Sequence, residues 1–532
     1  MSAGTPGEHP GTDALRPAPD GLLAALDAYE RALATDDLAA LDDAFVRSPG
    51  TLRGDDRGLL VGHDAISAFR GARGGVAPRR LTRVEVRTLA DDLALVVSVS
   101  TFDAGGSGLQ TQLWRREVGV WRIEAAHVTG RPRPLDTTVW RVVGDPLVPP
   151  TGSGPLDGTT VAVKDLYAVA GHRVGAGNPT FLRESQPADA SAAAVRALLA
   201  AGASVRGIAR TDEFAYALTG RNEHHGTPPN GVVPSALPGG SSSGSASAVR
   251  TGGADVGLGT DTAGSLRIPA SYQGLWGLRT THGLVDRAGL LPLAPSFDTV
   301  GWTTRDAETL LRALDASVPD GAGPGVLRAD AGTPVVLAEL LEAADPPTQE
   351  VFRAVVHDLD VVTLADLGLP ALDDLRELLR LVQGAEATAV HGAWIAAHPG
   401  ALGTVVGDRF AAAAANPPAL VADAWARFDG VRSAVRTALA ARVLVAPTAP
   451  GPAPALAADT AELERVRTAT TAMTALASVG GVPSLSVPAL TVDGAPVGLC
   501  LTGGAGTDRA LVTVAERWMP DGVGVGLPAG AA

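Results

Sequence analysis

Hydrophobic residues recur first at helical spacing and then at strand spacing over residues 20–130. Leu22, Leu26 and Tyr29 follow one another at intervals of four and three residues, which predicts a helix. Further helices are expected at residues 38–45 and 64–73, and strands at residues 59–62, 81–88, 93–102, 110–117 and 120–128. Helices followed by a strand meander indicate a small α+β domain. The Gly- and Pro-rich residues 1–19 that precede it are expected to be a disordered tail.

A second and larger domain is predicted at residues 155–520, where short apolar strands alternate with Ala- and Leu-rich helices. This rhythm is typical of a mixed or parallel sheet flanked by helices. Its first elements are expected at residues 161–164, 191–201 and 205–210. Residues 131–154 are rich in Pro, Gly and Thr and are expected to link the two domains, and residues 521–532 to form a tail.

Composition excludes several classes of protein. A net charge of -14 disfavours nucleic acid as a partner. The single cysteine, Cys500, allows no disulfide within the chain, and the ten histidines form no metal-ligand pattern. There is no signal peptide and no apolar run of about 18 residues that would cross a membrane. The sequence therefore predicts a cytoplasmic protein with no metal, no cofactor, and neither a membrane nor a nucleic-acid partner.

The chain has 43 Lys and Arg residues, and Lys164 is its only lysine. Arginine stays charged in a protein, whereas burial can shift a lysine toward its neutral form. Lys164 ends the apolar run Val161-Ala162-Val163, where a charge would be partly buried. The lysine is either a chance survivor or a residue whose chemistry requires a neutral amine, and its position favours the second interpretation.

Residues 239–269 read GGSSSGSASAVRTGGADVGLGTDTAGSLRIP and place Ser241 and Ser265 directly after glycine-containing turns. Composition alone would allow a Gly/Ser linker, but apolar residues continue through the stretch, which argues against one. A serine hydroxyl needs a base to become a nucleophile. Lys164 could be that base, acting through Ser241 on Ser265. The turn before Ser265 could aim backbone N–H groups at an oxyanion.

Two other interpretations of the glycine-rich stretch are weaker. Residues 240–244 match the Gly-x-Ser-x-Gly pattern of α/β-hydrolases, but that motif follows a strand, and the preceding GVVPSALPGG contains two prolines. A Ser/Asp/His triad is therefore disfavoured. No Gly-Lys-Ser/Thr sequence is present, so the stretch is not a phosphate-binding P-loop.

Taken in order, the segments GTTVAVKDL, PGGSSSGSASAV, GTDTAGSLRIPASYQGLWGLRTTHG and VLVAPTAPGPAP resemble the amidase signature family of serine hydrolases. The resemblance implies an α/β amidase signature fold. It further implies that Lys164 is the base, Ser241 the relay serine with a cis peptide bond, and Ser265 the acyl-forming nucleophile. The oxyanion hole would be formed by the backbone N–H groups of Thr262, Ala263, Gly264 and Ser265.

Two positions depart from the family pattern. Ala263 replaces the first of two glycines before the nucleophile, and would be strained if that position required a positive φ. Ser243 stands where glycine is common in the relay motif. Neither change removes a reacting group.

The N-terminal domain resembles the cone-shaped NTF2-like and SnoaL-like proteins. Its segments LLVGHDAISAFRGAR and VGVWRIEAAHVTG are similar to the small accessory protein of cyanuric-acid degradation and its fused relatives. Tyr29 and Arg53 occupy the places of a Tyr and an Arg that matter in that protein's cavity. The alternative is a core tyrosine and a surface arginine.

Together these resemblances imply an amidase that converts a small carboxamide into a carboxylic acid and ammonia. The chain is expected to be a homo-oligomer, and its N-terminal domain is a candidate site of this self-association. One alternative is the role of the amidase-like component of a glutamine amidotransferase, in tRNA-dependent amidotransfer. Another is that the N-terminal domain makes the chain chiefly an assembly or binding module. The substrate is not predicted, because the region expected to form the pocket wall, about residues 310–440, carries no motif.

Overall fold

A computed structural model describes residues 18–55, 58–73, 79–102, 107–129, 136–318, 327–356 and 358–518. The chain forms two compact units that divide between Leu135 and Asp136. The predicted C-terminal tail, and all but two residues of the predicted N-terminal tail, lie outside the described residues.

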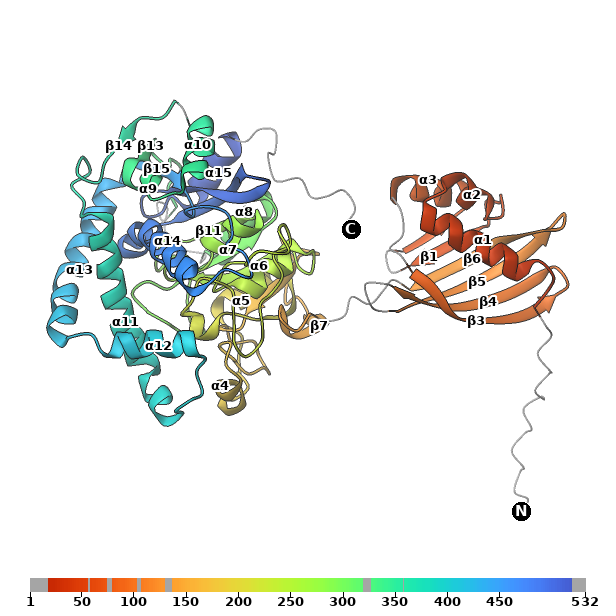
Figure 1. Ribbon diagram of the computed structural model, residues 1–532, viewed down its shortest axis with the longest axis horizontal. Helices are drawn as coiled ribbons and strands as arrows, with labels where there is room; N and C mark the ends of the chain where they lie inside the picture. The colour runs from red at the N-terminus through yellow and green to blue at the C-terminus, as the bar shows by residue number, and fades with distance from the viewer. Residues whose placement is uncertain are drawn as a thin grey trace, which may run out of the picture. The chain divides into compact units, whose positions relative to one another are not determined.

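The N-terminal unit is an α+β domain, as predicted. Its described elements are α1 (Leu22–Thr35), α2 (Leu38–Asp43), β1 (Leu52–Asp55), β2 (Gly58–Val61), α3 (His63–Arg73), β3 (Arg79–Ala90), β4 (Leu93–Phe102), β5 (Ser107–Glu117) and β6 (Val120–Thr129). The strands form one sheet in the order β2-β1-β6-β5-β4-β3, and α1 crosses one face of it (Figure 1). Leu22, Leu26 and Tyr29 pack against Trp114 and Ile123 of the sheet, so the helical spacing of these residues buries them together.

The larger unit contains a mixed eleven-stranded sheet in the order β14-β13-β15-β17-β16-β11-β12-β10-β8-β9-β7. Its described strands are β7 (Trp140–Val148), β8 (Thr160–Lys164), β9 (Ser204–Ala209), β10 (Val256–Asp261), β11 (Trp276–Arg279), β12 (Thr299–Thr304), β13 (Thr333–Leu337), β14 (Val361–Val362), β15 (Arg442–Pro447), β16 (Ser484–Val492) and β17 (Ala495–Thr502). Its described α-helices are α4 (Pro179–Glu184), α5 (Ala193–Ala200), α6 (Ser243–Arg250), α7 (Arg267–Gln273), α8 (Ala307–Ser317), α9 (Ala338–Glu342), α10 (Pro346–Val355), α11 (Leu372–Ala397), α12 (Thr404–Ala414), α13 (Pro418–Ala438), α14 (Thr460–Gly480) and α15 (Asp508–Trp518).

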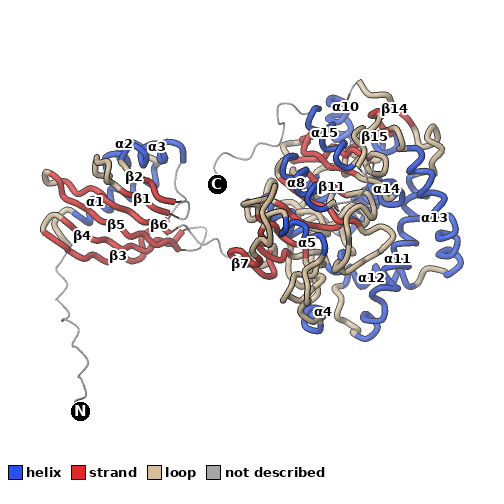
Figure 2. Tube along the Cα trace, turned by 180° about the vertical axis from the view of Figure 1, so that it is seen from behind, coloured by secondary structure: helices blue, strands red, loops and turns tan. Residues whose placement is uncertain are grey.

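Helices cover both faces of this sheet. Val443 and Val445 of β15 belong to an apolar cluster that includes α5, α8 and α15, while Leu444 and Ala446 belong to a second cluster that includes α11 to α14. Successive residues of a strand point to opposite faces, so the two clusters are the two sides of one three-layer core. Figure 2 shows α11, α12 and α13 gathered along one flank of the unit.

The prediction that residues 131–154 form a linker is wrong for the middle part of this range. Trp140–Val148 forms β7, which pairs antiparallel with β9 at the edge of the large sheet. The register shifts between Val143 and Val148, around Pro146. An edge strand tolerates proline because one side of its backbone needs no partner. The Pro and Gly content therefore concealed a strand that Trp140 anchors by packing near Ala162 and Ala209. Residues 131–135 lie outside the described residues.

The stretch at residues 239–269 forms the centre of the larger unit. It runs through α6, β10 and α7, and every residue of these three elements is buried. Small side chains let α6 pack closely against β10, while α7 packs against α6 and against β11, β16 and β17. The linker interpretation of this stretch is therefore wrong.

Candidate active site

Lys164 is the last residue of β8 and is completely buried. Its Nζ lies 2.8 Å from Oγ of Ser241, 3.0 Å from Oγ of Ser242 and 2.7 Å from Oγ1 of Thr260. β8 is parallel to β10, and this pairing places Lys164 beside the strand that leads to Ser265. Lys164 and Ser241, which are 77 residues apart in the sequence, are thus in direct hydrogen-bond contact.

Burial lowers the pKa of Lys164 to about 7, although the charges of Asp212, Asp261 and Asp298 act in the opposite direction. A neutral amine has two N–H donors and one lone pair, so one of its three hydroxyl neighbours must donate a hydrogen bond to Nζ. Ser242 Oγ already donates to the carbonyl of Thr260. The hydroxyls of Ser241 and Thr260 are therefore the two that can face the lone pair.

Ser241 is held by its backbone. The Gly240–Ser241 peptide bond is cis, and the Ser241 carbonyl accepts hydrogen bonds from Thr211 Oγ1 at 2.8 Å and from the Asp212 amide at 3.2 Å. A Cβ at position 240 would lie 2.3 Å from Asp212 Oδ2, so only glycine fits before the serine. The amide of Ser242 donates to the carbonyl of Ser265 at 3.1 Å, which ties the two serine-bearing segments together.

Asp212 is a buried carboxyl group that the sequence interpretation did not single out. It accepts hydrogen bonds from the amide of Gly220 at 3.0 Å and from Ser243 Oγ at 3.2 Å. Burial raises the pKa of Asp212 to about 6, while these bonds and Lys164 act against that rise. The hydroxyl of Ser243, the residue that departs from the family pattern, thus has the Asp212 carboxyl group as its hydrogen-bond acceptor. Because Asp212 lies in the segment TDEFA after β9, its proximity to Ser241 depends on tertiary packing.

The turn before Ser265 is anchored by Asp261, the last residue of β10. Burial alone would raise the pKa of Asp261, but the guanidinium groups of Arg267 and Arg279, at 2.9 and 3.1 Å, hold it well below its ordinary range. The same carboxylate accepts a hydrogen bond from the amide of Gly264 at 2.9 Å. That amide is therefore engaged, which disfavours the predicted role of Gly264 in an oxyanion hole.

Ala263 adopts an ordinary backbone conformation, since the positive φ of this turn falls on Gly264, at +117°. Alanine at position 263 therefore does not strain the turn. Thr262 is fixed by its hydroxyl, which donates to Asp298 at 2.6 Å. The amides of Ala263 and Ser265 have no protein acceptor among the described residues.

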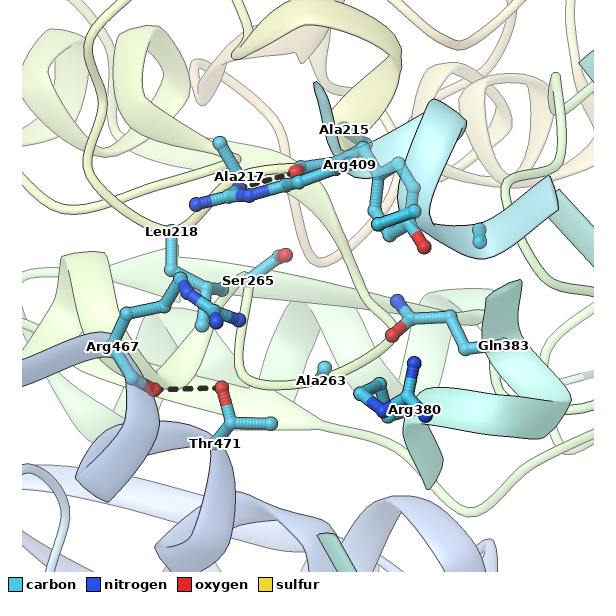
Figure 3. A pocket seen from close by; sticks show the side chains of 13 residues that line it. Ala215, Ala217, Leu218, Ala263, Ser265, Arg380, Gln383, Arg409, Arg467 and Thr471 are labelled. Atoms are coloured by element: carbon cyan, nitrogen blue, oxygen red, sulfur yellow. Dashed lines mark hydrogen bonds between the residues drawn. The ribbon is translucent and has the colours of Figure 1, made fainter. Parts of the chain in front are cut away.

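A cavity of about 160 Å³ opens in front of Ser265. Ala263 and Ser265 line it together with the segment at residues 215–218 and parts of α11, α12 and α14. Figure 3 shows Arg380, Arg409 and Arg467 arranged around the space before the Ser265 side chain. Sequence reasoning missed all three, because they come from helices without a motif. Phe214 and Ala215 have positive φ values of 49° and 58°, so the edge of this wall is held in an unusual backbone conformation.

In the N-terminal unit, Tyr29 and Arg53 are both buried, which rules out a surface arginine. The Tyr29 hydroxyl accepts a hydrogen bond from Arg70 at 2.7 Å. Arg53 pairs with Asp55 at 2.8 Å and stacks over the ring of Phe69, 4.4 Å from its centroid. The described residues show no direct contact between Tyr29 and Arg53, so their shared role in a cavity stays a prediction.

Neither a metal-ligand cluster nor a membrane-spanning helix occurs in the described part of the chain. No group of three or more His, Cys, Asp and Glu side chains there is placed to hold a metal ion. None of the helices described is long and apolar enough to cross a membrane.

Comparison with known proteins identifies both units. Residues 150–321 match the family model described as Amidase, and residues 20–132 match the model described as AtzH-like. "Amidase 1" of Oryza sativa subsp. japonica is 34% identical over 401 residues, which cover 69% of this chain and 92% of the rice protein. The chain belongs to the amidase family, with an AtzH-like unit at its N-terminus, as both resemblances implied.

Two further relatives bear on function. A component of the glutamyl-tRNA(Gln) amidotransferase of Halobacterium salinarum is 31% identical over 411 residues, covering 68% of this chain and 95% of that protein. A structure titled "An unexpected vestigial protein complex reveals the evolutionary origins of an s-triazine catabolic enzyme" superposes with a TM-score of 0.63 at 29% identity. That match covers 69% of this chain and 84% of the other, and it confirms the amidase fold.

Proposed function

We propose that this chain is an amidase that hydrolyses a small carboxamide to a carboxylic acid and ammonia through an acyl-enzyme on Ser265. The observation that carries the proposal is the buried amine of Lys164, 2.8 Å from Ser241 and shifted by burial toward its neutral form. Membership of the amidase family supports the same reaction class. Water is the only co-reactant, so the reaction needs no cofactor.

The proposed proton path runs from Ser265 through Ser241 to Lys164. Neutral Lys164 accepts the Ser241 proton while Ser241 accepts the proton of Ser265, and the Ser265 oxygen forms a bond to the amide carbon. The proton returns by the same path to the nitrogen of the breaking C–N bond, and ammonia leaves. Water then attacks the ester, gives one proton to the same relay, and releases the acid as Ser265 regains its hydrogen.

The negative charge that develops on the carbonyl oxygen needs hydrogen-bond donors. We assign this role to the backbone amides of Thr262, Ala263 and Ser265. The free amides of Ala263 and Ser265 support this assignment, because both residues line the cavity. Donors of this kind are worth about 100- to 1,000-fold in rate each.

Covalent labelling tests the nucleophile. A fluorophosphonate probe should label the wild-type chain once, and Ser265→Ala should abolish both the labelling and ammonia release. Ser245→Ala is the matched control, since Ser245 is also a buried serine and its hydroxyl donates to the carbonyl of Leu258. Labelling that persists in Ser265→Ala at another serine would reassign the nucleophile.

A second candidate function is supported by the similarity to the amidotransferase component. In that role the ammonia would pass to a partner protein and not to solvent. Free ammonia released by the purified chain, without tRNA or ATP, would favour the amidase. Hydrolysis that appears only when tRNA, ATP and further proteins of such a complex are added would favour amidotransfer.

We also propose that the chain is a homo-oligomer that assembles through its N-terminal unit in the cytoplasm. Exposed apolar side chains on that unit support self-association, among them Leu59, Leu89 and Leu109, which are 64%, 56% and 43% exposed. The single cysteine, Cys500, is free, as a reducing compartment would keep it. Light scattering of the full chain should give a multiple of 53.7 kDa, and a strictly monomeric mass would contradict assembly.

A further inference from the structure

We propose that the substrate of this amidase carries a carboxylate as well as the amide, and that Arg409 binds it. The substrate class is therefore short monoamides of dicarboxylic acids and amides of similar charge. This inference rests on the proposed function, and it names the chemistry of the same cavity. Three arginines, one each on α11, α12 and α14, line the space before Ser265.

Two of the three arginines are neutralised by glutamates on their own helices. Arg380 makes two hydrogen bonds to Glu377, at 2.7 and 2.6 Å, and Arg467 pairs in the same way with Glu464. These side chains shape the wall while adding little net charge to it.

Arg409 differs from the other two. Its Nη1 donates to the backbone carbonyl of Tyr216 at 2.5 Å, and it makes no ion pair with a carboxylate within the described part of the chain. Burial lowers the pKa of Arg409 and the charge of Arg467 adds to that effect, while the charges of Asp212 and Glu464 act against it. A cation that is partly withdrawn from water and has no carboxylate in direct contact is costly, and a bound carboxylate would offset that cost.

The geometry of the guanidinium suits such a ligand. With Nη1 committed to Tyr216, Nε and Nη2 have no protein acceptor among the described residues, and one edge of the guanidinium can therefore receive both oxygens of a carboxylate. Gln383 and Thr471 add polar groups to the lining, while Ala217, Leu218, Ala412 and Ala413 make the rest apolar.

The size of the cavity limits the length of the substrate. A cavity of about 150 Å³ holds one benzene molecule, and the one before Ser265 measures about 160 Å³. The methyl group of Ala263 is part of the lining that sets this volume. An amide and a carboxylate separated by two or three methylene groups have a comparable bulk, whereas a long acyl chain does not.

The test compares matched pairs of amides. Succinamate and glutaramate carry a carboxylate, and 4-methylpentanamide and 5-methylhexanamide replace it by an isopropyl group with the same number of non-hydrogen atoms. The measurement is kcat/KM for ammonia release. The wild type should prefer the anionic member of each pair by about 100-fold, the effect expected of a desolvated charge pair.

Arg409→Met should lower the ratio of anionic to neutral kcat/KM by about 100-fold, and Arg409→Lys should retain part of it because the charge remains. Arg427→Met is the matched control. Arg427 is a half-exposed arginine of α13 that pairs with Asp423 and does not line the cavity, so the ratio should not change. If Arg409 only positioned the segment at residues 215–218, both members of a pair would lose activity equally and the ratio would stay constant.

The outcomes separate this inference from the proposed function. Equal or better hydrolysis of the neutral amides, or a ratio unaffected by Arg409→Met, overturns the inference while amide hydrolysis stands. If none of the four amides releases ammonia, the proposed function fails for this class. The inference is then decided by binding: succinamate or glutaramate should raise the melting temperature of Ser265→Ala but not of the Ser265→Ala, Arg409→Met double variant. No stabilisation of Ser265→Ala by either compound overturns it.

Discussion

Basic side chains occur in two regions of the candidate site, and the two regions have opposite effects on the charge of these side chains. At the end of β8, Lys164 is buried among hydroxyl groups, and burial lowers its pKa to about 7. On the helical wall, Arg380 and Arg467 pair with glutamates and stay charged. The chain uses arginine where a fixed charge is needed and retains its only lysine where the proposed mechanism moves a proton. The type of basic residue thus follows the chemistry required at each place.

Exchanging the proposed base, Lys164, for a permanent cation should have the largest effect. Lys164→Arg keeps a positive charge but cannot accept a proton, and the buried site has no room for a guanidinium. We expect kcat/KM to fall by at least about 1,000-fold. Circular dichroism must show that the variant folds. If a folded Lys164→Arg variant kept more than a tenth of wild-type activity, the distinction between the two regions would collapse.

The pH dependence should show the next largest effect. Lys164 is protonated below its pKa of about 7 and cannot then accept the Ser241 proton. Wild-type kcat/KM should therefore fall about tenfold for each pH unit below 7 and level off above it. Carboxyl groups titrate nearby, since burial raises the pKa of Asp212 to about 6. A rate that is constant between pH 5 and 9 would argue against a neutral lysine base.

The turn between the two regions can be probed with a matched pair of substitutions. Gly264→Ala places a side chain at a φ of +117°, where its Cβ would also lie 3.1 Å from Thr474 Cγ2. We expect a loss of about 1–3 kcal/mol in unfolding free energy. Ala263→Gly should cost about 1 kcal/mol or less, because the backbone there is ordinary. Urea unfolding measures both, and the reverse order would show that the turn is assigned wrongly.

The smallest effect is expected for the reciprocal exchange on the wall. Arg467→Lys keeps the charge and loses only the two-pronged contact with Glu464, which is 56% exposed. We expect kcat/KM to fall less than about fivefold, as exposed pairs contribute little. Steady-state assays of ammonia release provide the comparison with Lys164→Arg. A loss as large as that of Lys164→Arg would mean that the wall also takes part in proton transfer.

The two regions also differ in how far the sequence predicts them. Lys164, Ser241 and Ser265 lie in segments with recognisable motifs, and the structure brings the first two within 2.8 Å. Arg380 and Arg409 are two among many arginines, on helices whose packing brings them together. No local sequence pattern predicts that these two arginines line the same cavity. The α+β and amidase folds were predictable from periodicity and motifs.

Some local features required the three-dimensional arrangement. Pro146 concealed the edge strand β7, because a proline-containing segment resembles a linker until its pairing with β9 is known. The engagement of the Gly264 amide by Asp261 could not be read from the spacing of the two residues, since it depends on the angle of the turn. Asp212 was likewise missed, because its contact with Ser243 joins segments 31 residues apart.

The protonation state of Lys164 is the central claim, and the sequence allows it to be measured directly. Because the chain has one lysine, labelling with ¹³Cε,¹⁵Nζ-lysine gives a single side-chain signal. Its chemical shift should titrate with a pKa of about 7 in the folded wild type. A lysine that stays charged up to pH 10, near the ordinary value of about 10.4, would contradict the account.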